Sequence, residues 1–102
     1  MRHVTISKIL CSVQCALLDN VTPNLRAVFV KFKDDVISLT FFYDKQPSED
    51  EAELASLADT EVIADFPSPE YQVNCQIVIH PYPLKLPKEG KYAYLRYEGK
   101  SV

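Results

Sequence analysis

Two runs of alternating apolar and polar residues, separated by one short turn, constrain the fold more than any other feature of this chain. The runs cover residues 25–33 and 36–43, and Lys33-Asp34-Asp35 stands between them. Side chains alternate between the two faces of a β-strand, so each run predicts a strand. Two such runs a turn apart predict a β-hairpin.

Helical patterns precede and follow this hairpin. Apolar residues recur at helical spacing over residues 4–20. Ser48 can cap the start of a second helix, and Glu51 stands at the capping-box position three residues later. This helix is expected to run to about Asp65, because Pro67 follows.

Two more strands complete the expected fold. Residues 72–80 and 92–98 are rich in β-branched and apolar residues, and a proline-rich connector joins them. The order α-β-β-α-β-β predicts an α+β protein, with a four-stranded, largely antiparallel sheet and two helices on one face. No linker or repeat interrupts the 102 residues, so a single domain over residues 1–102 is expected. The core face of the sheet is expected to collect Val28, Val30, Phe32, Ile37, Leu39, Phe41, Ile77 and Ile79.

Two further surfaces of the expected fold are apolar. The uncovered sheet face is expected to expose Phe29 and Phe42 near several tyrosines, a composition typical of protein-binding surfaces, although plain solvent exposure is the simpler interpretation. The first helix also has a second apolar side, formed by Val4, Cys11, Cys15 and Leu18. That side either packs within the domain, which we favour, or is left for a partner such as another copy of the chain.

Composition excludes most catalytic and cofactor chemistry. With two glycines, the chain has no nucleotide-binding loop. His3 and His80 are the only imidazoles, and neither forms a recognisable nucleophile–base pair. Cys11 and Cys15 are four residues apart but lack the further ligands that a metal site needs. We therefore predict neither an enzyme, nor a cofactor, nor a metal site.

Charge and cysteine usage indicate the environment of the protein. A net charge of −3 argues against direct binding of nucleic acid. The apolar stretches are too short for a membrane span or a signal peptide. Three cysteines in a chain without a secretion signal indicate reduced thiols, so a cytoplasmic location is expected.

The acidic residues are concentrated in one segment. Residues 44–70 carry a net charge of −8, and the rest of the chain carries +5. Glu61 and Asp65 stand near the end of the second helix, where the helix dipole makes an acid unfavourable by about 0.3–1 kcal/mol. Three interpretations are open: the segment is a solvated face, it pairs with the chain's own lysines at positions 31, 33, 85, 88 and 91, or it is a docking surface for a basic partner.

Several segments resemble a known family of bacterial proteins of about a hundred residues. The resemblance rests on Asn24–Val28, Phe41–Lys45 followed by Pro47–Glu51, Glu61–Pro67 and Tyr94–Tyr97. The sequence is similar to immunity proteins encoded beside polymorphic toxins, including those of contact-dependent growth inhibition. This resemblance implies a cytoplasmic inhibitor that binds a toxin domain, often a nuclease, and blocks it.

The leading hypothesis is stoichiometric neutralisation of a cognate toxin domain, expected to be a basic nuclease. The residues expected to contact the toxin are the acids Glu49, Asp50, Glu53, Asp59 and Glu61 and the aromatic residues Phe42 and Tyr94. A homo-oligomeric module, using the second face of the first helix, is one alternative. A small-molecule-binding domain, with its ligand between sheet and helices, is another.

Overall fold

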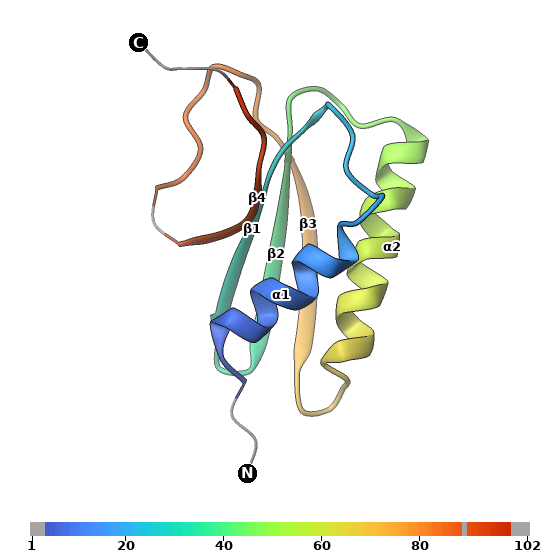
Figure 1. Ribbon diagram of the computed structural model, residues 1–102, viewed down its shortest axis with the longest axis vertical. Helices are drawn as coiled ribbons and strands as arrows, with labels where there is room; N and C mark the ends of the chain where they lie inside the picture. Colours follow the sequence, from blue (N-terminus) through green and yellow to red (C-terminus); the bar gives the residue numbers. More distant parts are fainter. Residues whose placement is uncertain (1–3, 89, 99–102) are drawn as a thin grey trace.

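A four-stranded sheet carries two helices on one face in the computed structural model, which describes residues 4–88 and 90–98 (Figure 1). The elements, in chain order, are α1 (Ile6–Ala16), β1 (Leu25–Lys33), β2 (Val36–Tyr43), α2 (Glu49–Asp65), β3 (Gln72–Ile79) and β4 (Lys91–Leu95). The predicted order and fold class are confirmed. His3 lies outside the described residues.

The predicted β-hairpin forms the centre of the sheet. β1 and β2 pair antiparallel from Leu25↔Tyr43 to Lys33↔Val36, so only two residues make the turn. Asp34 and Asp35 occupy that turn with φ values of 52° and 63°. Positive φ at both positions gives the turn a twist that matches the flanking strands, and aspartate tolerates it better than most residues.

The sheet is mixed rather than antiparallel throughout. Its strand order is β3-β2-β1-β4, and β1 pairs antiparallel with both of its neighbours. β3 instead runs parallel to β2, because α2 connects them and returns the chain to the end where β2 began. The parallel β2–β3 pair therefore refines the prediction of a largely antiparallel sheet.

The two helices end for local reasons. α1 stops at Ala16, earlier than predicted, because the Asn20 side chain donates to the Ala16 carbonyl (2.7 Å) and Asp19 adopts a φ of 65°. α2 follows its prediction closely, with the expected capping box between Ser48 and Glu51. Among the described residues, neither helix has both the length and the apolar character needed to cross a membrane.

The main core lies between the helices and the sheet. Apolar side chains from both helices and from the sheet fill it, including Ile9 and Val13 of α1, Ala58 and Val62 of α2, and the sheet residues Val28, Val30, Ile37, Leu39 and Phe41. Ile77 and Ile79 were expected here, but they are 41% and 45% exposed. β3 is an edge strand, with a neighbouring strand on one side only, and Val73 and Cys75 are its residues that pack against the core.

A second, smaller core covers part of the opposite sheet face. Phe29 and Phe42 were expected to be exposed there, but each is only 6% exposed. Together with Ala27 they pack against Val78, Leu86 and Tyr92. Leu86 belongs to the proline-rich connector, which folds back over the sheet. The expectation failed because connector residues far from the hairpin in the sequence bury these rings.

Most of the second apolar side of α1 is left uncovered. Cys11 and Cys15 are exposed, and Leu18, just beyond the helix, is 72% exposed. We favoured packing of this side within the domain, and that expectation is wrong. The buried residues of α1, Ile9, Val13 and Ala16, lie on its other side, and Val4 is the one member of the second side that packs against the core.

Gly90 is required where the connector meets β4. Its φ is 124°, and a Cβ built on it would overlap the Phe29 ring. Gly90→Ala is therefore expected to lower the free energy of unfolding by about 1–3 kcal/mol, through backbone strain and the clash with Phe29. Urea denaturation measures this loss. In the Phe29→Leu background the loss should shrink, because only the strain remains; an unchanged midpoint for Gly90→Ala alone would contradict the account.

Candidate functional site

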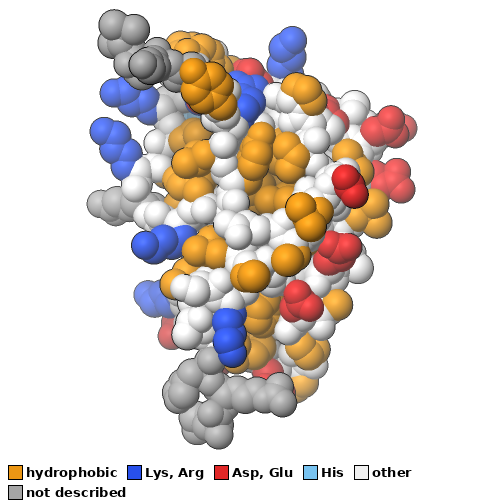
Figure 2. Space-filling model, in the orientation of Figure 1, with side chains coloured by type: hydrophobic (Ala, Val, Ile, Leu, Met, Phe, Trp, Pro, Cys, Tyr) orange, Lys and Arg blue, Asp and Glu red, His pale blue; other side chains and the backbone are white. Residues whose placement is uncertain are grey.

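The acidic residues of α2 form a strongly charged surface. The helix has seven acids and no base: Glu49, Asp50, Glu51, Glu53, Asp59, Glu61 and Asp65. Figure 2 shows acidic side chains along the flank occupied by α2 and lysines and arginines along the opposite flank. Glu49, Asp50, Glu53 and Glu61 are exposed. The molecule therefore presents opposite charges on two sides.

Two acids of α2 have structural partners. Glu51 accepts hydrogen bonds from the Thr22 hydroxyl and the Asn24 amide, which attaches the loop before β1 to the start of α2. The bond from Thr22, followed by the backbone bond from Ser48, holds the pKa of Glu51 below its usual value. Asp65 accepts a hydrogen bond from Ser12 of α1 (2.6 Å). Joining the two helices explains the position of Asp65, but no such bond explains Glu61 within the described part of the chain.

Asp59, like Glu51, is a half-buried acid of α2. Burial raises the pKa of its carboxyl group. One of its carboxylate oxygens, Oδ1, is buried without a hydrogen-bond partner in the described structure. Its charge also contributes to raising the pKa of Cys75 on β3 to about 12, after burial, which is the larger cause. Asp59 therefore lies on the side of α2 that faces β3.

The acids of α2 form no salt bridge with the lysines that the structure describes. Every salt bridge among residues 4–88 and 90–98 is made by Arg26 or Arg96, with Asp44 and Glu98. The interpretation in which lysines neutralise the acidic segment therefore does not hold for these residues. A solvated face and a docking surface remain.

The two aromatic candidates lie apart from the acidic helix. Phe42 lies in the small core, under the connector. Tyr94 lies on β4, half-buried against the main core and opposite Val28. A β-bulge between Val28 and Phe29 places Tyr92 opposite Phe29, so the two tyrosines contact different cores although they are two residues apart. The structure therefore does not bring Phe42, Tyr94 and the α2 acids into one cluster.

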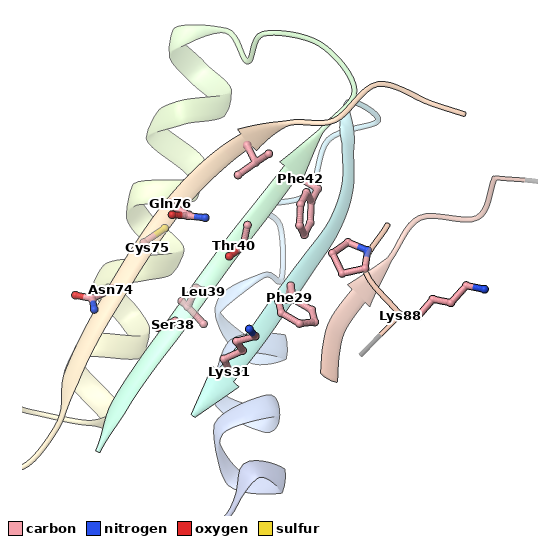
Figure 3. Close-up of a pocket in the computed structure, with 12 residues that line it drawn as sticks. Phe29, Lys31, Ser38, Leu39, Thr40, Phe42, Asn74, Cys75, Gln76 and Lys88 are labelled. Carbon is pink, nitrogen blue, oxygen red and sulfur yellow. The ribbon is translucent and has the colours of Figure 1, made fainter. Parts of the chain in front are cut away.

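A groove of about 780 Å³ lies on the face of the sheet opposite the helices (Figure 3). Strand residues Phe29, Phe42, Thr40 and Gln76 line it, together with connector residues. Among the residues that the structure describes, Lys31 and Lys88 are its charged lining residues. This lining suits neutral or anionic groups, the opposite preference to that of the α2 surface.

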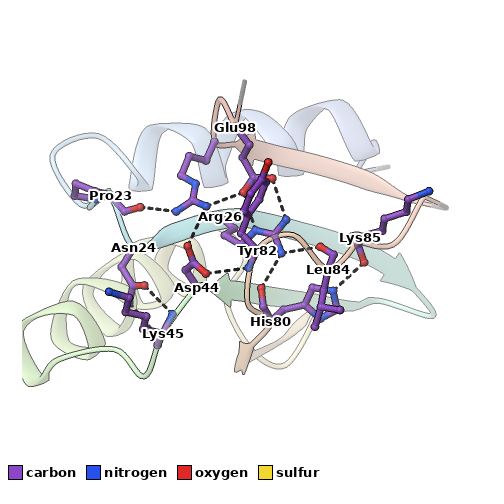
Figure 4. A network of polar contacts seen from close by, with 11 residues as sticks. Pro23, Asn24, Arg26, Asp44, Lys45, His80, Tyr82, Leu84, Lys85 and Glu98 are labelled. Carbon is purple, nitrogen blue, oxygen red and sulfur yellow. Dashed lines mark hydrogen bonds and ion pairs between the residues drawn. The ribbon is translucent and has the colours of Figure 1, made fainter. Parts of the chain in front are cut away.

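A buried arginine holds the connector that forms one wall of this groove. Arg26 is 2% exposed, and its Nε and Nη2 atoms donate to the two carboxylate oxygens of Glu98 (2.7 and 2.9 Å) (Figure 4). Its Nη1 atom donates to the carbonyls of His80 (2.7 Å) and Leu84 (2.9 Å). The Tyr82 ring lies beside the guanidinium, 5.6 Å from its carbon to the ring centroid. Arg26 therefore joins β1, the connector and the segment after β4.

Arg96 extends this network to the end of β2. Its Nη2 atom contacts Glu98 (2.9 Å) and Asp44 (3.2 Å). Asp44 also accepts a hydrogen bond from the Tyr82 backbone N–H (2.9 Å), and this bond is the main cause of its lowered pKa. The hydrogen bonds from Arg26 likewise hold the pKa of Glu98 below its usual value.

The sequence interpretation did not identify Arg26, although a signal was present. Arg26 has an even number, as Val28, Val30 and Phe32 do in the first alternating run. Alternation therefore puts a charged residue on the strand face that was expected to be apolar. It escapes the apolar core because the β1–β2 register shifts between Leu25 and Ala27. A lone charge at an apolar position of a strand indicates a buried ion pair, although its partner, Glu98, is 72 residues away.

The fold and this geometry define a small α+β protein with a strongly acidic helix, α2. The model of the MafI2 immunity protein family matches residues 6–98, a span that includes both helices and all four strands of the described structure. The chain belongs to the MafI2 immunity protein family. No curated protein has a significantly similar sequence. The expected resemblance to immunity proteins of bacterial polymorphic toxins is confirmed, and such a protein acts on a toxin partner.

The lowered pKa of Glu98 predicts a pH-dependent contribution to stability. Its carboxylate stabilises the fold above the ordinary glutamate pKa of about 4.3, and this contribution is lost as the pH falls through the lower pKa of the folded state. Glu98→Gln should lower the free energy of unfolding at pH 7 by about 1.5–3 kcal/mol, because charge-assisted bonds to Arg26 are weakened. It should also flatten the decline below about pH 5.

Urea denaturation at several pH values measures both effects. Glu61→Gln serves as the control, since Glu61 is exposed on α2 and outside the network. A Glu98→Gln profile parallel to that of the unchanged protein would contradict the role of Glu98.

Proposed function

We propose that this chain is a cytoplasmic immunity protein that neutralises a cognate toxin domain by stoichiometric binding through the acidic surface of α2. The toxin is proposed to be a basic nuclease delivered by a neighbouring cell, as in contact-dependent growth inhibition. One observation carries the proposal: α2 has seven acids and no base, and the chain's described lysines do not pair with them. The acids proposed to contact the toxin are Glu49, Asp50, Glu53, Asp59 and Glu61.

The inhibitory mechanism follows from the charge that a nuclease needs. An enzyme that grips a phosphate backbone has a basic surface, and a rigid helix lined with carboxylates can occupy that surface in place of the substrate. The complementary potentials would also accelerate the encounter of the two proteins. Phe42, at the groove, and Tyr94, on β4, are the proposed aromatic contacts.

Charge reversal on α2 tests this proposal. The triple variant Glu49→Lys, Glu53→Lys and Glu61→Lys is expected to weaken toxin binding about 10- to 100-fold, because attraction becomes repulsion at three exposed positions. The probe is the C-terminal domain of the protein encoded in the adjoining reading frame, and titration calorimetry measures its affinity. Protection of cells that express the toxin should fall in parallel.

A control separates the location of the charge from its amount. Glu49→Gln, Glu53→Gln and Glu61→Gln remove three negative charges from α2, whereas Asp34→Asn, Asp35→Asn and Glu70→Gln remove three exposed ones elsewhere. Only the first set is expected to weaken binding, and both should keep the circular dichroism spectrum of the unchanged protein. Equal affinities for the two sets would refute a specific role for α2.

The uncovered side of α1 favours one alternative function. Cys11, Cys15 and Leu18 are exposed and could join two copies in a homo-oligomeric module that has no toxin partner. Under the proposed function, the protein binds the toxin through α2 and does not need to pair with a second copy. The isolated protein is therefore expected to be a monomer whose mass does not change with concentration. Light scattering over a wide concentration range measures this mass. If the unchanged protein is a dimer and the Leu18→Asp variant is a monomer, the result would support the alternative.

A further inference from the structure

The outer edge of β3 is an open position for another strand. β3 is the first strand in the order β3-β2-β1-β4, and β2 is its only neighbour in the described sheet. It pairs with β2 residue for residue, from Val36↔Gln72 to Tyr43↔Ile79. The opposite side of β3 therefore has no described strand beside it along all eight of its residues.

The direction of the free backbone groups follows from the bonds at the two ends of β3. The Gln72 N–H donates to the Asp35 carbonyl (3.0 Å), and the His80 N–H donates to the Tyr43 carbonyl (2.7 Å). Backbone groups of successive residues in a strand point to alternate sides, so the even-numbered residues face β2. The N–H and C=O groups of Val73, Cys75, Ile77 and Ile79 face outward. No hydrogen bond of the described residues occupies them.

This edge lacks the features by which proteins normally block strand addition. Charged residues, prolines, bulges and short length usually protect an edge strand. Residues 72–79 contain no charged residue, proline or glycine, and the pairing with β2 has no register shift. The opposite edge has several of these features: β4 has five residues, begins with Lys91 and pairs with β1 through a bulge. The open edge at β3 is therefore specific to that side of the sheet.

The side chains of β3 add an apolar contact to this backbone template. Ile77 and Ile79 are 41% and 45% exposed on the face that carries α2. Gln72, Asn74 and Gln76 are exposed on the other face. An added strand would cover the two isoleucines on one face and meet amide side chains on the other.

The charge of α2 decides which occupant fits. In an antiparallel pair of two β3 strands, a two-fold axis normal to the sheet would place both α2 helices on the same face, beside the same seam. Each helix has seven acids and no base, so the two would repel each other. Asp59 lies on the β3 side of α2, and its Oδ1 atom already lacks a hydrogen-bond partner among the described residues. A strand that carries lysine or arginine would instead be attracted by the acids of α2.

We propose that the outer edge of β3 accepts an extended segment of the toxin as a fifth strand of the sheet. This segment has apolar residues that cover Ile77 and Ile79, and basic residues that reach carboxylates on the β3 side of α2. The inference rests on the proposed function and deepens it, because it states how the toxin's main chain binds beside the acidic helix.

Hydrogen exchange of individual amides, read by NMR, tests the added strand directly. The probe is again the C-terminal domain encoded in the adjoining reading frame, added to the full chain. The amides of Val73, Cys75, Ile77 and Ile79 are expected to exchange at least about 10-fold more slowly in the complex, because each gains a position in a ladder. Unchanged exchange at these four amides in a complex that still forms would overturn the added strand and leave the proposed function intact.

A proline variant supplies the second readout. Ile77→Pro removes one outward N–H without removing a bond to β2, and edge strands tolerate such prolines. The matched control is Leu95→Pro on β4, where the adjacent Arg96 N–H donates to the Arg26 carbonyl (2.7 Å), so that the Leu95 N–H also faces outward. Ile77→Pro is expected to weaken toxin binding at least about 10-fold and Leu95→Pro to leave it nearly unchanged. Equal affinities for two folded variants would contradict the proposal.

Two further outcomes are decisive. A complete absence of binding by the unchanged protein would refute the proposed function, and the added strand with it. Slow exchange at the four outward amides in the isolated protein, together with a dimer in light scattering, would show that a second copy occupies the edge and would overturn the toxin strand. If Ile77→Pro does not fold, the exchange experiment on the unchanged protein still decides.

Discussion

The buried ion pair between Arg26 and Glu98 is the interaction on which the sheet face opposite the helices depends, because it holds the connector there. A guanidinium that is 2% exposed requires a full set of acceptors, and it finds them in Glu98 and in two connector carbonyls. These contacts fold the connector over the sheet, which buries Phe29 and Phe42 and forms a wall of the groove. One charge in a strand thus organises segments that are more than 50 residues away from it.

α2 packs on the core with one side and presents acidic residues to solvent on its other sides. Small buried residues, Ala55 and Ala58, let the helix pack closely on the core, and a capping box with three acids in the first turn stabilises its start. Its other sides carry acids that helix stability does not explain, Glu61 above all. As the crossover between β2 and β3, α2 also lies next in the chain to the strand that forms the free edge of the sheet. The same connection therefore creates the parallel strand pair and the charged surface next to it.

The prediction from sequence succeeded where the determining interactions are local. The β1–β2 hairpin depends on alternation and a two-residue turn, and the start of α2 depends on Ser48 and Glu51, which are three residues apart. It failed where a side chain's environment comes from distant segments. Ile77 has the alternation of a core residue, but its position on an edge strand leaves it half-exposed. For the candidate site, the exposed acids were identifiable from the charge count, whereas the structural roles of Glu51 and Asp65 depend on partners in α1 and the loop after it.

The sequence by itself determined the element order, the acidic character of α2 and the resemblance to immunity proteins, because periodicity, capping and charge are properties of short segments. Only the tertiary structure decided which strand lies at the edge, which face the connector covers and which acids are left without partners. Those features depend on contacts between residues far apart in the chain, such as Arg26 with Glu98 and Asp35 with Gln72. Alternation shows that a strand has two faces, but the chain's path in space decides what lies against each of them.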